Sequence, residues 1–338
     1  MKREVIILVL SFSLANIYSQ TGGDNIYEFL NLSPNAYISS LGGFNISCFS
    51  NDPSMASFNP SLAGAEDNGI LSLNYANYFA GINYGLIMYS HHSDSLGSFA
   101  GGIQYLNYGR FERADESGNR NGYFNAAEYA LNIIYSRQID SIFNVGINIK
   151  PIISHLENYT SLGIAMDIGT SWESKDGLIS AGLVIRNLGM QLTTYSGNRE
   201  KLPFEIIAGI STKLRHAPLR FSLTTRHLEK YKLVHLYDEQ DDPGYSKLEK
   251  TAENIMRHFI FGAELMPAEN FFIAAGFNYQ RRKELQYDVK SSTVGFSLGA
   301  GIKTSSIDLV ISRARYHLAG STMNFSVLLK PSLFNSLK

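Results

Sequence analysis

The 338-residue chain has one cysteine, Cys48, and only 17% of its residues are charged, against about 25% in typical soluble domains. A single cysteine excludes an internal disulfide framework, and we expect Cys48 to be a small buried hydrophobic side chain. The 29 basic and 30 acidic residues leave a net charge of −1, which argues against a nucleic-acid partner. After the N-terminal segment no apolar run approaches about 18 residues, so membrane-spanning helices are excluded.

Motifs for common enzymatic and metal chemistry are also missing. No serine is followed three residues later by lysine, so the nucleophile motif of penicillin-binding transpeptidases is absent. His91 and His92 fall in a predicted short turn and lack the spacing of a metal site. The acidic run at 238–242 could attract calcium, but it lacks the spaced ligands and glycine of an EF-hand. We therefore predict a protein that is not an enzyme and uses no cofactor and no metal.

The first residues are typical of a secretory signal peptide. Lys2 and Arg3 form a basic start, an apolar stretch follows at 5–14, and Ser19 supplies a small residue for cleavage. A membrane anchor is the alternative, but the stretch is well short of the roughly 20 residues needed to span a bilayer. We predict a signal peptide at residues 1–19.

From residue 68 onward the sequence alternates between apolar and small or polar residues with a period of two, which predicts β-strands. About fourteen such segments, each roughly 9 to 14 residues long, exceed ordinary strands and match the length that crosses a membrane. Gly, Ser, Ala, Asn and single charges dominate the second face, as in the lumen of a barrel. Aromatic residues near segment ends are expected at the lipid–water boundary: Tyr75, Tyr78, Phe79, Tyr105, Tyr108, Phe111, Tyr159 and Trp172.

Connection length follows strand parity. Connections after the third, seventh, ninth and eleventh segments are long, and those after even-numbered segments are short. Outer-membrane barrels have long loops outside the cell and short periplasmic turns, whereas a soluble β-sandwich, the alternative, has no reason for this pattern. We predict an all-β, transmembrane antiparallel barrel over residues 68–338, with both termini on the short-turn side. The long connections are 110–121, 189–202, 231–254 and 281–292; the short ones are 91–96, 137–141, 174–176, 214–217, 267–270 and 305–306.

Residues 20–67 do not read as strands. Residues 26–30 could form a short helical turn, and Asp52 followed by Pro53 is a helix start signal that the sequence at 59–62 then breaks. A segment of this length ahead of the barrel is expected to fold into the lumen as a plug. A periplasmic extension is the alternative.

The N-terminal region resembles the PorQ family of outer-membrane barrels, which belong to the type IX secretion system of Bacteroidetes-type bacteria. The resemblance lies in the sequence at 29–32, the glycine pair at 42–43, Asp52 and the sequence at 59–62; the related PorV and FadL-like barrels share some of these elements. It implies a FadL-like barrel of fourteen strands in the cell outer membrane. The plug motif consists of Phe29, Leu30, Gly42, Gly43, Asp52, Asn59 and Pro60.

The resemblance also implies partners: outer-membrane lipids, a PorZ-like surface protein of the cargo attachment complex, and other type IX secretion components. The long connection at 231–254 is expected to contribute to partner binding, because it mixes acidic and aromatic residues with a short helix at 247–256. Its candidate contact residues are Tyr237, Asp238, Asp241, Asp242 and Tyr245. The alternative function is a FadL-like transporter of hydrophobic small molecules. The strand pattern is consistent with an anchor and with a transporter.

Overall fold

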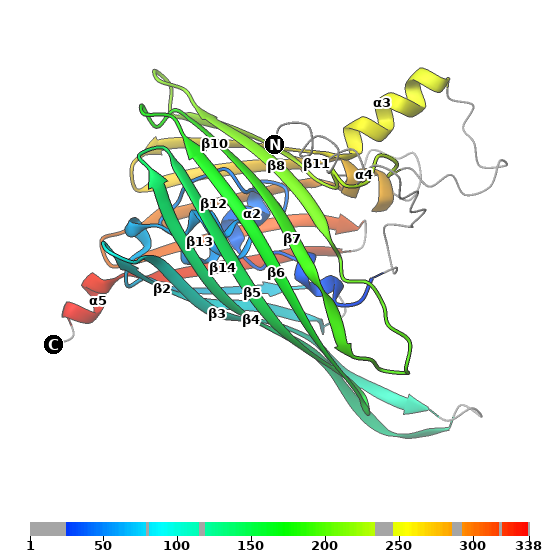
Figure 1. The fold of residues 1–338 in the computed structure, drawn as a ribbon. Coiled ribbons are helices and arrows are strands. Elements are labelled where there is room, and N and C mark those ends of the chain that lie inside the picture. The colour runs from blue at the N-terminus through cyan, green and yellow to red at the C-terminus, as the bar shows by residue number, and fades with distance from the viewer. Residues whose placement is uncertain are drawn as a thin grey trace, which may run out of the picture.

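The computed structural model describes residues 25–78, 81–114, 119–233, 246–285, 293–317 and 320–336. Fourteen antiparallel strands close into one barrel, each paired with its sequence neighbours, and β1 pairs with β14 (Figure 1). The fold predicted from the sequence is confirmed. The strands are β1 Leu71–Asn77, β2 Asn83–Ser93, β3 Gly97–Ala114, β4 Arg120–Asp140, β5 Phe143–Leu156, β6 Tyr159–Glu173, β7 Ile179–Thr193, β8 Glu205–Lys213, β9 Leu219–Thr225, β10 Phe259–Ala268, β11 Phe271–Asn278, β12 Phe296–Lys303, β13 Ile307–His317 and β14 Gly320–Leu329.

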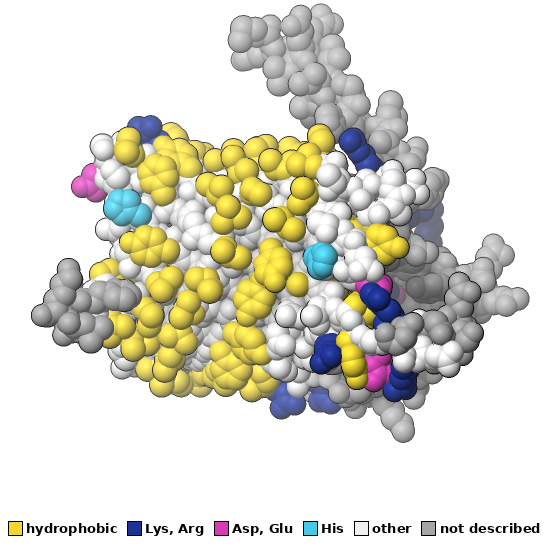
Figure 2. Space-filling model, turned by 90° about the horizontal axis from the view of Figure 1, so that it is seen from below, with side chains coloured by type: hydrophobic (Ala, Val, Ile, Leu, Met, Phe, Trp, Pro, Cys, Tyr) yellow, Lys and Arg dark blue, Asp and Glu magenta, His cyan; other side chains and the backbone are white. Residues whose placement is uncertain are grey.

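The period of two in the sequence becomes the two faces of the barrel wall. In β7, Leu183 is 49% exposed on the outside, while the next residue, Val184, is completely buried in the lumen. Small and polar side chains such as Asn148 and Ser154 of β5 point inward and are buried. Figure 2 shows a broad apolar area over the middle of the wall, with charged side chains toward its ends. None of the helices in the described residues is long and apolar enough to cross a membrane.

The predicted segregation of the connections is present for those after β7, β9 and β11. One end carries connections of two to five residues, such as the one between Asp140 and Phe143. The other end carries shorter connections such as 157–158 as well as three long ones, 194–204, 226–258 and 279–295. Two of these contain helices, α3 (Lys247–Arg257), which the sequence predicted, and α4 (Tyr279–Leu285). We call the two ends the short-turn end and the long-loop end.

Several predicted boundaries were wrong. The connection expected at 110–121 is mostly strand, because β3 and β4 continue to pair with each other beyond their neighbours, as far as Ala114 and Arg120. His91 and His92 lie in β2, paired with β3, because the turn begins only after Ser93. Tyr78 and Tyr108 were expected at a lipid boundary but face the lumen; Tyr78 is buried there and the Tyr108 hydroxyl donates to Glu128.

The segment 25–67 lies inside the barrel, where Figure 1 shows its short helices enclosed by the wall. We call it the plug. Its elements are η2 Glu28–Asn31, α2 Ala36–Ser40, η3 Pro53–Ser57, η4 Pro60–Leu62 and η5 Ala65–Asp67. Nearly all side chains from Ile26 to Ala63 are buried.

The plug runs through the barrel from one end to the other. Asn25 forms a parallel β-bridge with Lys201 in the connection between β7 and β8, at the long-loop end. The plug then leads into β1, which starts at the short-turn end, where β14 also finishes. The prediction that both ends of the chain lie on one side is therefore wrong for the described N-terminal residues, because the plug crosses the lumen before the first strand begins.

Candidate functional site

Asp52 organises the centre of the plug. As the N-cap of η3 it accepts the Ser54 backbone N–H at 2.9 Å, which satisfies one of the free donors at the start of the helix. The same carboxylate accepts the Asn35 side-chain amide at 2.7 Å and the Ser72 hydroxyl of β1 at 2.8 Å. One buried side chain thus joins η3, the start of α2 and the barrel wall.

Asn59 and Pro60 attach the plug to another part of the wall, formed by β5 and β6. Asn59 donates to the carbonyl oxygens of Ile46 at 2.9 Å and Thr170 at 3.2 Å, and its side-chain oxygen caps η4. The wall comes this close because glycines face the plug. A Cβ atom on Gly146 of β5 would lie 2.4 Å from the carbonyl carbon of Pro60, and one on Gly169 of β6 would lie 2.1 Å from Asn59 Oδ1.

Gly42 and Gly43 form the turn after α2. Both have positive φ angles, 100° and 97°, a conformation that favours glycine. The Gly43 N–H donates to the Ile38 carbonyl oxygen at 3.0 Å, which ends the helix. A Cβ on Gly42 would lie 2.4 Å from a methyl carbon of Ile260, so the turn packs directly on β10.

Phe29 and Leu30 belong to an apolar cluster in the lumen at the long-loop end. The buried cluster is extended by the partly exposed side chains of Leu32, Ile82 and Tyr195. The plug backbone is held here by polar contacts, because Tyr84 donates to the Leu32 carbonyl oxygen at 2.9 Å and Arg186 donates to that of Leu30 at 3.0 Å. The seven predicted plug-motif residues thus lie inside the barrel, where they form packing and capping contacts.

The structure adds a buried ionic group that sequence reasoning missed. Lys150 Nζ of β5 lies 2.6 Å from Asp167 Oδ1 of β6, and both side chains are almost completely inaccessible. Lys150 also donates to Asn187 Oδ1, and Asn187 Nδ2 donates to the Pro203 carbonyl oxygen at 2.9 Å. A buried charge is tolerated only when it is paired and hydrogen-bonded. Here the ion pair and its hydrogen-bonding partner Asn187 come from three neighbouring strands.

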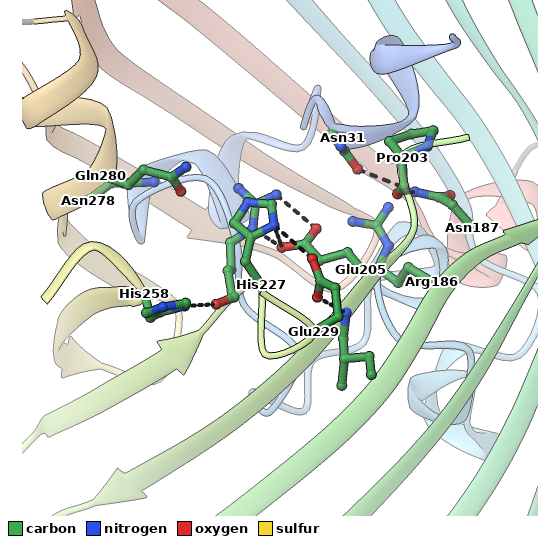
Figure 3. Close-up of polar contacts among 12 residues, drawn as sticks. Asn31, Arg186, Asn187, Pro203, Glu205, His227, Glu229, His258, Asn278 and Gln280 are labelled. Carbon is green, nitrogen blue, oxygen red and sulfur yellow. Dashed lines mark hydrogen bonds and ion pairs between the residues drawn. The ribbon is translucent and has the colours of Figure 1, made fainter. Parts of the chain in front are cut away.

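A second ionic group lies nearby on β8 and the end of β9 (Figure 3). The Arg226 guanidinium forms two hydrogen bonds with the Glu205 carboxylate, at 2.6 and 2.8 Å. His227 Nδ1 lies 3.3 Å from Glu229, whose other oxygen accepts the Ile206 N–H at 2.9 Å. The arrangement fixes the start of β8 to the chain that follows β9.

The plug covers both arginines of this wall. The Arg226 guanidinium carbon stands 3.5 Å from the centre of the Phe44 ring, and that of Arg186 lies between the Phe44 and Phe58 rings at 5.4 and 5.5 Å. A cation and the face of an aromatic ring attract each other more strongly where water is excluded. Within the described residues no cluster of His, Cys, Asp or Glu has the arrangement of a metal site. The groups therefore hold the plug against the wall.

The signal for these charges was present in the sequence. Lys150 and Arg186 are the single Lys or Arg residues on β5 and β7, and Asp167 is flanked by small and apolar residues on β6. An ionisable residue at membrane depth is a functional candidate by default. Which charges pair could not be predicted, because the partners come from different strands.

At the long-loop end, α3 carries an apolar face that none of the described residues covers. Leu248, Ala252 and Ile255 share one side of the helix and are exposed, Leu248 by 79%. The opposite side is attached to the protein, since Asn254 accepts the Leu233 N–H at 2.7 Å and Glu253 lies 3.5 Å from Lys283 of α4. The predicted contact residues Tyr237, Asp238, Asp241, Asp242 and Tyr245 lie outside the described residues.

No family model matches the sequence, and no curated protein matches it. Solved structures do share the fold. The chain is similar to the toluene transporter TbuX of Ralstonia pickettii (11% identity, TM-score 0.52, covering 89% of this chain and 97% of that one) and to the monoaromatic hydrocarbon channel CymD (10%, 0.53, 89% and 98%). It is also similar to a Pseudomonas aeruginosa FadL homologue (12%, 0.50, 87% and 98%). At these identities the likeness establishes a FadL-like barrel fold.

Proposed function

We propose that the chain is an outer-membrane transporter of small hydrophobic molecules whose plug acts as the gate. The observation that carries the proposal is the apolar cluster at the long-loop end, where Leu32, Ile82 and Tyr195 are only partly buried beside the start of the plug. A hydrophobic molecule arriving from outside gains free energy by leaving water for such a surface. The shared fold with a toluene transporter and a monoaromatic hydrocarbon channel supports this substrate class.

The outer apolar wall supports the membrane placement. Large apolar side chains such as Ile103, Leu131 and Ile153 are about half exposed around the barrel, where lipid chains would cover them. The mature protein should fractionate with the outer membrane, and recovery in the soluble periplasm would contradict this placement.

Because the plug runs through the lumen from end to end, a solute can cross only if the plug moves. Cys48 of the plug provides a way to test this. Its sulfur lies 3.2 Å from the Ser211 hydroxyl oxygen of β8, so Ser211→Cys places a second thiol where a disulfide would tie the plug to the wall. The wild-type chain has no second cysteine and cannot form this bond.

The assay measures uptake of radiolabelled toluene by intact cells that lack other hydrocarbon transporters. Expression of the wild type should raise uptake. Oxidised Ser211→Cys, identified by its altered mobility on a non-reducing denaturing gel, should lose that gain and recover it with a reductant. Ser211→Ala is the control. If wild-type expression does not raise uptake of toluene or of other apolar solutes, the transport proposal is wrong. If the locked variant transports normally, the plug is not the gate.

A second candidate function is favoured by a different observation, the apolar face of α3 that the described residues leave exposed. An exposed apolar helix face at the end that would lie outside the cell suits a protein partner. This agrees with the resemblance to PorQ barrels, whose role would be to anchor a PorZ-like surface protein in type IX secretion. The test is Leu248→Ser with Ile255→Ser, using Lys247→Ser as an exposed control on the same helix. A pull-down from solubilised membranes should lose the surface partner only in the first variant.

A further inference from the structure

A hollow of about 650 Å³ lies on the outer surface of the barrel, at the base of the extension formed by β3 and β4. It is separate from the lumen, because the side chains of Asn107, Asn125, Ala127, Tyr129 and His155 that line it belong to the outward face of β3, β4 and β5. The hollow lies at the edge of the apolar area on the outer wall. Tyr129 and its paired neighbour Ile153 belong to this area, and the polar side chains of the hollow lie further toward the long-loop end.

The hollow arises from an irregularity in β3. The pairing between β3 and β4 shifts at Asn107 and Gly109, where Tyr108 has no partner, and Gly109 has a φ of 88°. A bulge of this kind bends a strand and redirects the following side chains. As a result Arg110 points outward beside Asn125, and the small residues Gly109 and Ala126 form the floor.

Arg110 is the cation of this hollow and forms no ion pair within the described residues. Its guanidinium carbon lies 3.8 Å from the centre of the Tyr123 ring, which holds the side chain at the rim. The acidic groups nearby are already paired, Glu112 with Arg120 and Glu157 with Arg113, each at 2.7 Å. An anion that approaches therefore meets one free guanidinium rather than a neutralised pair.

The other polar groups suit the same ligand. Asn107 and Asn125 carry amide donors, and His155 Nδ1 is in contact with the Thr160 hydroxyl at 3.0 Å, which leaves Nε2 for a ligand. Arginine with neutral donors around it is a common arrangement for phosphate, because the guanidinium donates two parallel hydrogen bonds. An apolar ligand would leave these donors without partners, and a soluble anion would make no use of Tyr129 and Ile153.

We propose that this hollow binds the phosphate group of an outer-leaflet lipid, with Arg110, His155 and the two asparagine amides on the phosphate and the acyl chains against Tyr129 and Ile153. This lipid-binding proposal rests on the membrane placement proposed above, but it does not depend on the transport or the anchoring function. The site would hold one lipid at the side of the barrel where the β3–β4 extension rises from the membrane.

The experiment is native mass spectrometry of the detergent-purified full chain with a phosphorylated lipid A as probe. Arg110→Gln combined with His155→Gln should weaken binding about tenfold or more, as expected for losing hydrogen bonds to a charged group. Arg137→Gln, which removes an exposed cation at the other end of β4, should bind like the wild type. Heat-modifiable migration on gels confirms that each variant is folded.

Two further probes separate the chemistry. Dephosphorylated lipid A should bind as weakly to the wild type as phosphorylated lipid A does to the double variant, and inorganic phosphate should not displace the lipid at equal concentration. Equal binding of both lipids would overturn the phosphate assignment. Displacement by inorganic phosphate would overturn the lipid assignment in favour of a free anion. Unchanged binding in the double variant would overturn the site, while fractionation with the outer membrane would remain unaffected.

Discussion

Gly146→Ala is the sharpest way to perturb the contact between plug and wall. A Cβ at this position would lie 2.4 Å from the Pro60 carbonyl carbon and 2.5 Å from both the Pro60 carbonyl oxygen and the Ser61 nitrogen. Real Cβ atoms essentially never come within 3.0 Å of another heavy atom, and nine in ten of their contacts lie beyond 3.4 Å, so one side must move by about 0.6 to 1 Å. β5 is paired along both edges in the barrel, and η4 is therefore the part that yields.

The magnitude follows from the cost of overpacking. Inserting a methyl group into a well-packed interior costs typically about 1–3 kcal/mol, and a clash with backbone atoms cannot be relieved by a rotamer change. If this cost falls on the docked plug alone, the ratio of released to docked plug rises by about 5- to 150-fold. The barrel should keep its strand pairing, since the three heavy atoms nearest to the added methyl group all belong to the plug.

The assay is hydrogen exchange followed by mass spectrometry. Amides of residues 53–63 should exchange faster in Gly146→Ala, while those of β5 and β6 should stay protected. The matched control is Gly101→Ala on β3, where the nearest heavy atom outside the neighbouring residues is 3.9 Å from the new Cβ. Identical exchange of the plug in the two variants would refute the reasoning.

Other predictions address single buried groups. Asn59→Ala should release the plug more than Asn51→Ala, because Asn59 is buried with four hydrogen bonds and Asn51 is exposed; equal hydrogen exchange would contradict this. Lys150→Met should cost about 3–5 kcal/mol in denaturant unfolding by leaving the Asp167 carboxylate unpaired, and adding Asp167→Leu should restore most of it. Burial raises the pKa of Asp67 well above its usual range, so its contribution to stability is complete below about pH 3.9 and is lost as the pH rises through the raised pKa. As the pH rises from about 3.9 to the raised pKa, the melting temperature of the wild type should therefore fall relative to that of Asp67→Asn. Parallel curves of melting temperature against pH would contradict this prediction.

The barrel could be predicted because its wall has one simple rule. A strand with lipid on one side and a small-residue lumen on the other must alternate, and the length of the alternation gives the span. The lengths of the connections then distinguished the two ends of the barrel. Predicted strand boundaries were wrong where two strands stay paired beyond the rest of the wall, as in β3 and β4, because a paired ribbon outside the membrane needs no apolar outer face.

The inside of the barrel was only partly predictable. Asp52 with Pro53 and Asn59 with Pro60 are local capping signals, and the structure places both at the start of short helices. α2 was missed because its five residues carry no helical periodicity. The path of the plug runs from Asn25, beside Lys201 at the long-loop end, to β1. It depends on contacts with residues far away in sequence, and one sequence does not reveal which strand receives each turn.

The two candidate functions make different demands on the plug. A gate must leave the lumen at a modest free-energy cost, so a transporter with a loosened plug should pass more solute. An anchor binds its partner on the outside through α3 and gains nothing when the plug is released. Gly146→Ala therefore separates the two: under the transport proposal toluene uptake should exceed that of Gly101→Ala, and under the anchoring proposal partner recovery should be equal in both variants. A released plug without a rise in uptake would contradict the transport proposal, and a fall in partner recovery would contradict the anchoring proposal.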